Sequence, residues 1–329
     1  LAFKINSMTP IAIMHIGNKN NKEQIENLET LINHKVPEIR AATLNAFLKI
    51  DSSENYKQKF RSLLKLPDRK LVNVMKQIDN YTLFNSDWIL EKIKSDDKNL
   101  IKILLPAIKQ KEDDVFIPNL IYLAGDPFLK EKVLDVVLSF SFEKLYLEIK
   151  TIVDSNRIDG KTIHGIVNIL LKYRNKEVQD VISKLLLKDN KKLIYVLAEK
   201  IISLGYDPLQ LIDENKMIDY IYTLGREIYS QIILVTDENH FIKDIFIEDY
   251  YSNQIKKDTK LILLLSGLLM PDKPIESYIH SIEMRDSQVP FIIEVFESEL
   301  PKRLTNVVVP IIECESIFEK SEHGNKILS

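Results

Sequence analysis

The chain has 329 residues, of which 45% are hydrophobic and 28% are charged, a composition typical of a folded protein with an ample core. Only 8 residues are glycine, which argues against Gly-rich phosphate-binding loops and tight β-hairpins and favours helices joined by polar turns. The 45 basic residues nearly balance the 48 acidic ones, so the chain lacks the positive excess typical of nucleic-acid-binding proteins.

The first predicted helix pair occupies residues 23–33 and 36–50. In the first segment, apolar residues such as Ile25, Leu28 and Ile32 follow the spacing of an amphipathic helix. The second segment has a proline near its start, where the missing N–H is tolerated. We expect its apolar stripe to be buried against the first helix. That stripe consists of Ile39, Ala42, Leu44, Phe47 and Ile50.

The string PEIRAATLNAFLKI at residues 37–50 resembles the second helix of a HEAT repeat. The matching residues are Pro37, Glu38, Ile39, Arg40, Ala41, Ala42, Leu44 and Phe47. His34 and Leu48 depart from the pattern, because many repeats have Asp and Gly there, and we expect a weaker turn cap as a result. The resemblance implies an all-α fold of the armadillo type, an α-solenoid in which each helix pair stacks on its neighbours.

Weaker versions of this pattern recur at residues 96–110, 126–140 and 175–187. The second of these opens with Asp126 as a predicted N-cap and Pro127 at the first helical position. The spacing between them is irregular compared with the ~40–47 residues of a regular HEAT period, so we interpret the array as degenerate. Further helices are predicted at 53–66, 69–80, 86–95, 114–123, 142–155, 160–173, 190–204, 215–235, 240–249, 251–269, 273–282, 284–299 and 301–313.

The predicted organisation has three parts. Residues 1–22 form an irregular N-terminal segment, residues 23–313 form a single continuous HEAT-like α-solenoid, and residues 314–329 form a polar C-terminal tail that frays. No linker rich in Pro, Gly and Ser interrupts the array. No apolar stretch reaches the ~20 residues that a membrane-spanning helix needs, so we expect no direct insertion of this segment.

Motifs of enzyme chemistry are missing from the sequence. It has no nucleotide-binding glycine loop, no nucleophile elbow and no HExxH, and its six histidines include no i, i+4 pair. Cys314 is the only cysteine, which favours a reducing compartment and excludes a thiolate metal cluster. The sequence therefore predicts no catalytic residue, no cofactor and no metal site.

Paired carboxylates and short basic runs have simple structural interpretations. Asp96–Asp97 and Asp113–Asp114 precede predicted helices, where acidic side chains favour the positive end of the helix dipole. The runs KDNKK at 188–192 and KKDTK at 256–260 are interpreted as solvated helix ends and turns.

Tyrosines are frequent between Tyr195 and Tyr251. They are suited to protein interfaces because one end of the side chain is apolar and the other forms hydrogen bonds, although ordinary packing at helix borders is the more common reason for such tyrosines. The predicted protein-interaction residues are Tyr206, Tyr220, Tyr222, Tyr229 and Tyr250.

Residues 260–313 resemble the closing repeats of the cytoplasmic HEAT module of bacterial ATP/ADP-translocase-like nucleotide transporters, a module sometimes fused to a cyclic-nucleotide-binding domain. The matching residues are Leu264, Leu265, Leu268, Leu269, Pro271, Pro274, Arg285, Asp286, Glu294, Phe296, Leu300, Pro310, Ile311, Ile312 and Glu313. Pro290 departs from the pattern and predicts a kink or a later helix start. The resemblance implies a polytopic membrane transporter domain as partner in cis and a location at the cytoplasmic face of the inner membrane. Residue 1 is Leu, which leaves open whether the chain is a piece of a longer protein.

Two functional hypotheses follow. The first is a non-catalytic protein-interaction or scaffolding solenoid, the cytoplasmic regulatory or structural module of a membrane nucleotide transporter. The alternative is a HEAT-fold nucleic-acid-binding protein of the DNA-glycosylase type. Balanced charge and a single tryptophan argue against the alternative, so we expect no nucleic-acid partner.

Overall fold

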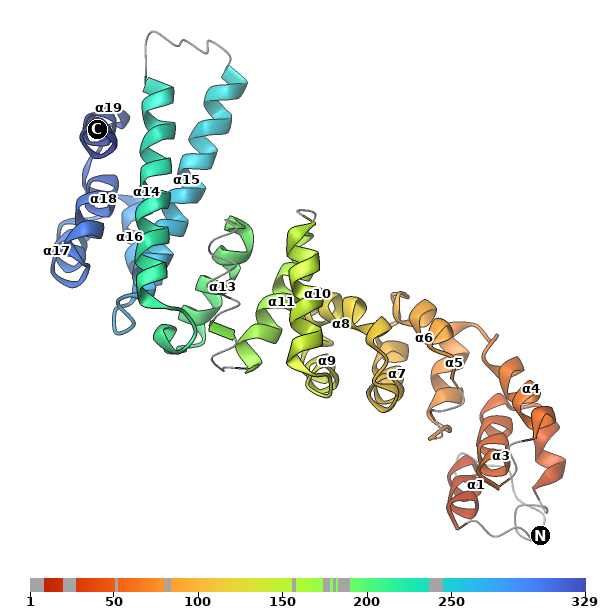
Figure 1. The fold of residues 1–329 in the computed structure, drawn as a ribbon. Coiled ribbons are helices and arrows are strands. Elements are labelled where there is room, and N and C mark those ends of the chain that lie inside the picture. Colours follow the sequence, from red (N-terminus) through yellow and green to blue (C-terminus); the bar gives the residue numbers. More distant parts are fainter. Residues whose placement is uncertain are drawn as a thin grey trace. The chain divides into compact units, whose positions relative to one another are not determined.

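The computed structural model describes residues 9–19, 28–50, 53–79, 81, 84–155, 158–173, 178–179, 182, 190–236 and 245–329 (Figure 1). Within these ranges every regular element is a helix and no strand occurs, which confirms the predicted all-α fold class. The chain forms two compact units, unit 1 (Leu1–Ile169) and unit 2 (Leu170–Ser329). The predicted continuous array divides between them, and its continuity from one unit to the other stays a prediction.

Unit 1 is built of short helices that pack on helices nearby in sequence, both adjacent ones and the next but one. Its elements are α1 (Thr9–Asn18), the 3₁₀ helix η1 (Glu29–Asn33), α3 (Pro37–Ile50), α4 (Glu54–Leu63), α5 (Asp68–Met75), α6 (Ser86–Ile93), α7 (Lys98–Lys111), the 3₁₀ helix η3 (Asp114–Phe116), α8 (Ile117–Ala124), α9 (Lys130–Val137), α10 (Phe142–Asp154) and most of α11 (Gly160–Tyr173). Helix α7 packs on α5, α6 and α9, while α8 packs on α9 and α10. Leu71, Leu104 and Val133 are fully buried between these helices. Such stacking hides an apolar face that a single helix pair leaves uncovered.

The segment at residues 37–50 forms α3, and four residues of its predicted stripe are buried: Ile39, Ala42, Leu44 and Phe47 are all at most 7% exposed. The fifth, Ile50, has a side chain outside the described part of the chain. The His34 imidazole Nδ1 accepts a hydrogen bond from the Val36 N–H at 3.1 Å. Arg40 then donates to the His34 carbonyl at 2.6 Å. The turn therefore keeps a side-chain cap, because the imidazole accepts a backbone N–H in place of an acidic side chain, and the expectation that this cap is weaker stays a prediction.

Side-chain caps explain where several helices begin. Asp97 accepts hydrogen bonds from the N–H groups of Asn99 and Leu100 at the start of α7, and Asp113 accepts from Val115 at the start of η3. These bonds satisfy N–H groups that lack a partner within the helix. One member of each paired carboxylate is thus a cap, as predicted.

The two terminal segments differ from prediction. Thr9–Asn18 forms helix α1, which packs on α3 and buries Ile13, so the prediction of an irregular N-terminal segment is wrong for these residues. Its apolar residues supply enough buried surface to order a short helix. Ile317–Leu328 forms helix α19, so the prediction of a frayed polar tail is also wrong. This helix begins with a capping box between Ser316 and Glu319. The predicted helix at 175–187 lies almost wholly outside the described residues, as does the first half of 23–33.

Unit 2 contains two much longer helices. Its elements are α13 (Lys191–Ser203), the 3₁₀ helix η4 (Pro208–Gln210), α14 (Glu214–Thr236), α15 (Ile245–Leu268), α16 (Ile275–Met284), α17 (Val289–Glu299), α18 (Lys302–Glu313) and α19. Figure 1 shows α14 and α15 side by side and antiparallel. Helix α14 also packs against α18 and α19, which are distant from it in sequence. Among the described residues no helix is long and apolar enough to cross a membrane.

Residues 260–313 span the end of α15 and helices α16, α17 and α18. Pro290 lies in the first turn of α17, which confirms the predicted later helix start. Arg285 adopts a left-handed conformation (φ 51°) at the end of α16 and donates to the carbonyls of Ile312 and Cys314 at 2.7 and 3.0 Å. It thereby satisfies carbonyl groups at the C-terminal end of α18.

An aromatic cluster in unit 1 contains the only tryptophan of the chain. The ring of Trp88 stacks on Phe84 with centroids 5.5 Å apart, and Phe84 lies 5.7 Å from Phe60. Phe60 and Phe84 are both 1% exposed and belong to the core, whereas Trp88 is half-buried at its edge.

Helices α8 and α11 approach each other through two glycines. A Cβ atom on Gly165 would lie 1.9 Å from the Ile121 carbonyl oxygen, and one on Gly125 would lie 1.8 Å from the Lys161 carbonyl oxygen. Asn168 donates to the Ala124 carbonyl at 2.8 Å across the same contact. Only residues without a side chain allow the two backbones to come this close.

The glycine contact predicts that Gly165→Ala lowers the free energy of unfolding of unit 1 by about 1–3 kcal/mol or more, because the methyl group meets backbone that cannot move without repacking. Gly160→Ala is the matched control on the same helix, since a Cβ there meets nothing within 4 Å. We expect that control to change stability by less than about 1 kcal/mol. Urea unfolding followed by tryptophan fluorescence measures both, and equal effects would contradict the packing described.

Candidate functional site

The first candidate site, called here the Asp126 cluster, lies in unit 1 and consists of Lys98, Tyr122, Asp126, Phe128 and Lys161. Lys98 opens α7, Asp126 and Phe128 lie in the turn between α8 and α9, and Lys161 lies in the first turn of α11. The close contact of α8 with α11 brings Lys161 to the end of α8. Three turns that are separate in sequence therefore meet around one carboxylate.

Asp126 is the centre of this cluster and its side chain is only 8% exposed. Its carboxylate oxygens lie 3.0 Å from Lys98 Nζ and 3.2 Å from Lys161 Nζ, and the Phe128 N–H donates to it at 2.9 Å. Burial alone would raise the pKa of Asp126, but the hydrogen bonds from Lys98, Phe128 and Lys161 hold the pKa below its ordinary value. Asp126 caps the turn that leads into α9, because its side chain accepts from the Phe128 N–H and its carbonyl accepts from the N–H groups of Leu129 and Lys130. The regular helix begins at Lys130, however, so the predicted start at Pro127 is wrong.

Each lysine of the cluster also lies over an aromatic ring. Lys98 Nζ is 4.3 Å from the centroid of Phe128, and Lys161 Nζ is 4.2 Å from that of Tyr122. Phe128 is 72% exposed and Tyr122 is 43% exposed, so both rings reach the surface. A cavity of about 200 Å³ opens beside Lys98, Tyr122, Asp126 and Lys161. The arrangement combines positive charge with exposed aromatic surface.

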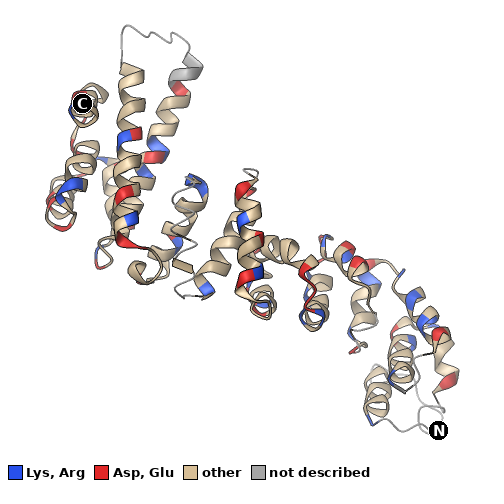
Figure 2. Ribbon diagram, viewed as in Figure 1, with Lys and Arg blue, Asp and Glu red and all other residues tan. Residues whose placement is uncertain are grey.

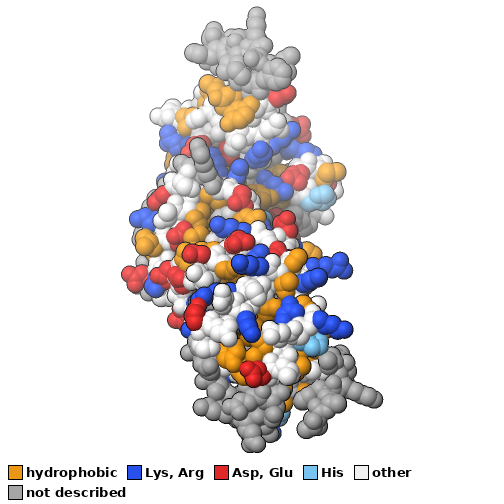
Figure 3. Space-filling view, turned by 90° about the vertical axis from the view of Figure 1, so that its right-hand side faces the viewer, with side chains coloured by type: hydrophobic (Ala, Val, Ile, Leu, Met, Phe, Trp, Pro, Cys, Tyr) orange, Lys and Arg blue, Asp and Glu red, His pale blue; other side chains and the backbone are white. Residues whose placement is uncertain are grey.

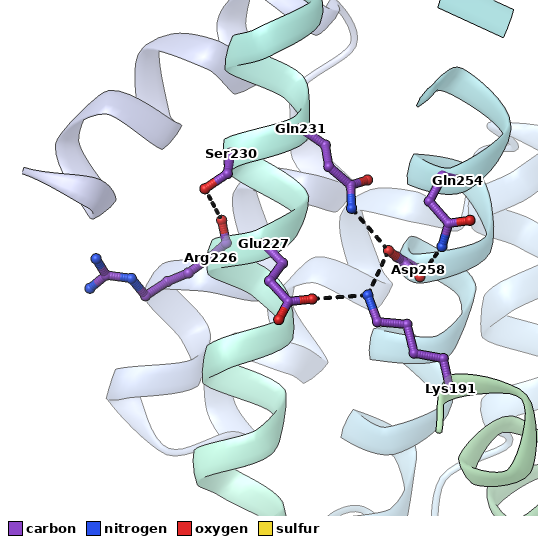
Figure 4. A network of polar contacts seen from close by, with 7 residues as sticks. All are labelled: Lys191, Arg226, Glu227, Ser230, Gln231, Gln254 and Asp258. Atoms are coloured by element: carbon purple, nitrogen blue, oxygen red, sulfur yellow. Dashed lines mark hydrogen bonds and ion pairs between the residues drawn. The ribbon is translucent and has the colours of Figure 1, made fainter. Parts of the chain in front are cut away.

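A second polar group, called here the Lys191 network, ties three helices of unit 2 together (Figure 4). Lys191 Nζ lies 2.9 Å from Glu227 and 3.0 Å from Asp258, which is 2% exposed. Gln254 and Gln231 donate to the Asp258 carboxylate at 2.9 and 3.3 Å. Burial alone would lower the pKa of Lys191, but Glu227 and Asp258 together raise it. The network joins α13, α14 and α15, and its burial indicates a structural role.

A larger open cavity lies between the end of α13, the end of α15 and the start of α16. Its volume is about 690 Å³, and we call it the Tyr206 pocket. Its polar and cyclic lining residues are Ser203, Tyr206, Asp207, Pro208, Pro271, Asp272, Lys273, Pro274, Glu276 and Ser277. This volume falls in the range of cavities that accept ligand groups or side chains of a partner.

The five predicted interaction tyrosines occupy different environments. Tyr206 lines the pocket just defined, and Tyr220 is half-buried on α14. Tyr222 is half-buried under the Arg303 guanidinium, 4.2 Å from the ring centroid. Tyr250 is 64% exposed and packs edge-on against Tyr251.

Tyr229 is fully buried, so it cannot be part of an exposed interaction surface. Its hydroxyl donates to the Val307 carbonyl at 2.9 Å, and burial raises its pKa strongly. The periodic apolar residues of α14 place position 229 on the inner face with Ile228 and Ile232. The residue therefore belongs to the core between α14 and α18.

The sequence predicts that the two basic runs are solvated. In the structure they instead supply the central ion pair of unit 2, Lys191 with Asp258. Lys191 comes from 188–192 and Asp258 from 256–260, which lies inside α15. The sequence does contain a signal that Asp258 is buried. It precedes Leu261, Ile262 and Leu265 by three, four and seven residues, which places it on the apolar face of the helix. The roles of Asp126, Lys98 and Lys161 had no such signal.

Metal-binding side chains are not gathered in the part of the chain that the structure describes. No set of three or more His, Cys, Asp and Glu side chains there could hold a metal ion. Cys314 is 8% exposed, and burial raises the pKa of its thiol, which disfavours the reactive thiolate.

Charge is mixed along the helices. Figure 2 shows Lys and Arg interspersed with Asp and Glu on the helices of both units, and the face seen in Figure 3 carries both signs close together with apolar side chains between them.

Comparisons of the chain with protein-family models, curated proteins and solved structures found no match.

The Lys191 network predicts that Lys191→Met lowers the free energy of unfolding by about 3–5 kcal/mol, because the buried Asp258 loses its cation. Lys273→Met is the control, since its partner Glu299 is half-exposed, and we expect a loss below about 1 kcal/mol. The double change Lys191→Met with Asp258→Leu should recover much of the loss. Chemical denaturation measures all three, and a neutral Lys191→Met would contradict the network.

The lowered pKa of Asp126 predicts a dependence of stability on pH. Its contribution to folding is fully present above the ordinary carboxyl pKa of about 3.9 and is lost as pH falls through the lower folded pKa. Asp126→Asn removes this contribution, so the stability difference between wild type and variant should be constant near neutral pH and shrink below about pH 4. Thermal unfolding across this range tests it, and a constant difference would contradict the assignment.

Proposed function

We propose that this chain is a non-catalytic protein-binding module, and that the Tyr206 pocket receives a Lys- or Arg-bearing segment of its partner. The observation that carries the proposal is the chemistry of the pocket, where acidic side chains, a tyrosine and three prolines surround one cavity of unit 2.

The charge of the pocket favours a cationic ligand. Asp207, Asp272 and Glu276 line it against a single lysine, Lys273, and that lysine pairs with Glu299 at 2.8 Å. Among the described residues, Asp272 and Glu276 form no ion pair. A partner's guanidinium or ammonium group would supply the charge that these carboxylates lack.

The walls of the pocket favour binding without rearrangement. Pro208, Pro271 and Pro274 have fixed φ angles, and the Asp207 carboxylate fixes its turn by accepting the Leu209 N–H at 3.1 Å. Tyr206 adds an aromatic surface against which a long basic side chain can pack. A preformed site loses less conformational entropy when a partner binds.

The wider role rests on sequence resemblance alone. Residues 260–313, which supply half of the pocket, resemble the HEAT module of ATP/ADP-translocase-like transporters. We therefore propose a regulatory or structural module at the cytoplasmic face of a membrane, with a transporter domain of the same polypeptide as partner. The mixed charge in Figures 2 and 3 lends no support to the nucleic-acid alternative, which needs a continuous basic surface.

The test is binding of a fluorescein-labelled peptide rich in Arg and Leu, measured by fluorescence anisotropy. The double variant Asp272→Asn with Glu276→Gln should weaken binding about tenfold, which corresponds to about 1.4 kcal/mol. Glu131→Gln with Asp135→Asn on α9 removes the same net charge elsewhere and should leave the affinity within about twofold.

Three results would contradict the proposal. They are equal affinities of the pocket variant and the wild type, equal binding of a peptide with Glu in place of Arg, and tighter binding of duplex DNA with a steep dependence on salt. The last of these would favour the nucleic-acid alternative.

A further inference from the structure

We propose that the Asp126 cluster of unit 1 is a second docking site, which binds an acidic segment of a protein through a carboxylate flanked by an apolar side chain. It differs from the Tyr206 pocket in position and in charge, so either site can exist without the other.

The first step concerns unused hydrogen-bond donors. Each lysine ammonium has three donors, whereas the Asp126 carboxylate already accepts bonds from Lys98, from the Phe128 N–H and from the Lys161 ammonium. Asp126 therefore occupies only some of the N–H donors of the two ammonium groups. Since Lys98 is 44% exposed and Lys161 is 30% exposed, their remaining N–H groups are accessible to a second carboxylate.

The second step concerns charge. Lys94, Lys98 and Lys161 line the cavity together with Asp96 and Asp126, so its net charge is +1. One carboxylate balances this charge. A phosphate group carries more negative charge, and the two aspartates of the lining would repel it. The cavity therefore favours a carboxylate over a phosphate or a nucleic-acid backbone.

The third step concerns the rings. Phe128 is 72% exposed and Tyr122 is 43% exposed on either side of the ammonium groups. A free small anion would leave these rings in water, whereas an apolar residue next to the bound carboxylate would cover them. Aromatic residues beside a buried charge pair are typical of residues that dominate binding energy at interfaces.

The fourth step concerns rigidity. The contact of Gly125 and Gly165 fixes Lys161 against α8, and the Asp97 cap fixes the first turn of α7 that carries Lys98. The Ser95 hydroxyl also lines the cavity, and its oxygen is buried without a hydrogen-bond partner among the described residues. It supplies a further donor for the second oxygen of an incoming carboxylate.

The experiment uses the whole chain and a fluorescein-labelled peptide rich in Glu with one central Phe, followed by fluorescence anisotropy. Lys98→Met and Lys161→Met should each weaken binding about tenfold, and Phe128→Ala about fivefold. Lys109→Met is the matched control, because it removes a lysine of α7 that pairs with Asp135 at the surface, and it should leave binding unchanged. Circular dichroism of each variant verifies that the helices persist.

Asp126→Asn separates the proposal from a purely structural role. The change frees both ammonium groups from their internal carboxylate, so it should strengthen binding of the acidic peptide at least threefold while it weakens folding. If the lysines only neutralise Asp126, neither this variant nor the lysine variants will change peptide binding, and the proposal fails.

Two further arms identify the ligand. Displacement of the peptide by inorganic phosphate, but not by acetate at equal ionic strength, would show a phosphate site and overturn the proposal. Binding of the acidic peptide should persist in the double variant Asp272→Asn with Glu276→Gln. The acidic-peptide and basic-peptide results are therefore read separately, and failure of one site leaves the other intact.

Discussion

The burial of one apolar face on each helix by its neighbours is the constraint on which both units depend. In unit 1 the neighbours are helices nearby in sequence, so helices of eight to fourteen residues suffice. In unit 2 the long α14 buries Tyr229 against α18 and also packs on α19, so helices distant in sequence complete its core. Isolated helices as short as those of unit 1 would be only marginally stable in water, so packing against neighbours is what orders them.

Both candidate docking sites lie in the turns between helices and take their geometry from this packing. The backbone contact between α8 and α11 places Lys161 beside Asp126, and the turn between α15 and α16 places Asp272 and Glu276 beside Tyr206. The Lys191 network differs because it lies between the helices, where a lost cation leaves a carboxylate in the core. Charge in the turns is available to partners, whereas charge between the helices serves the fold.

Local signals made much of the fold predictable. Pro37, Asp97 and Asp113 mark helix starts through their own backbone geometry or through hydrogen bonds to N–H groups two or three residues away. The buried apolar residues of α3 from Ile39 to Phe47 follow helical spacing. The sites were not predictable in this way. Asp126 meets Lys98 and Lys161 only after folding, from 28 and 35 residues away. The sequence does not show that Tyr229 is buried, because a tyrosine side chain suits both the core and the surface. Contacts across such separations depend on which helices pack, which spacing alone does not determine.

The place of Trp88 has a practical consequence for spectroscopy. It is the only tryptophan of the chain, and it is half-buried and stacked on Phe84, which belongs to the core of unit 1. Intrinsic indole emission therefore reports on one unit, while the far-ultraviolet signal of the helices reports on both. When the two signals change together during denaturation, the units unfold cooperatively, and when they separate, each unit has a stability of its own. The chain thus contains a built-in optical probe of the coupling between its halves.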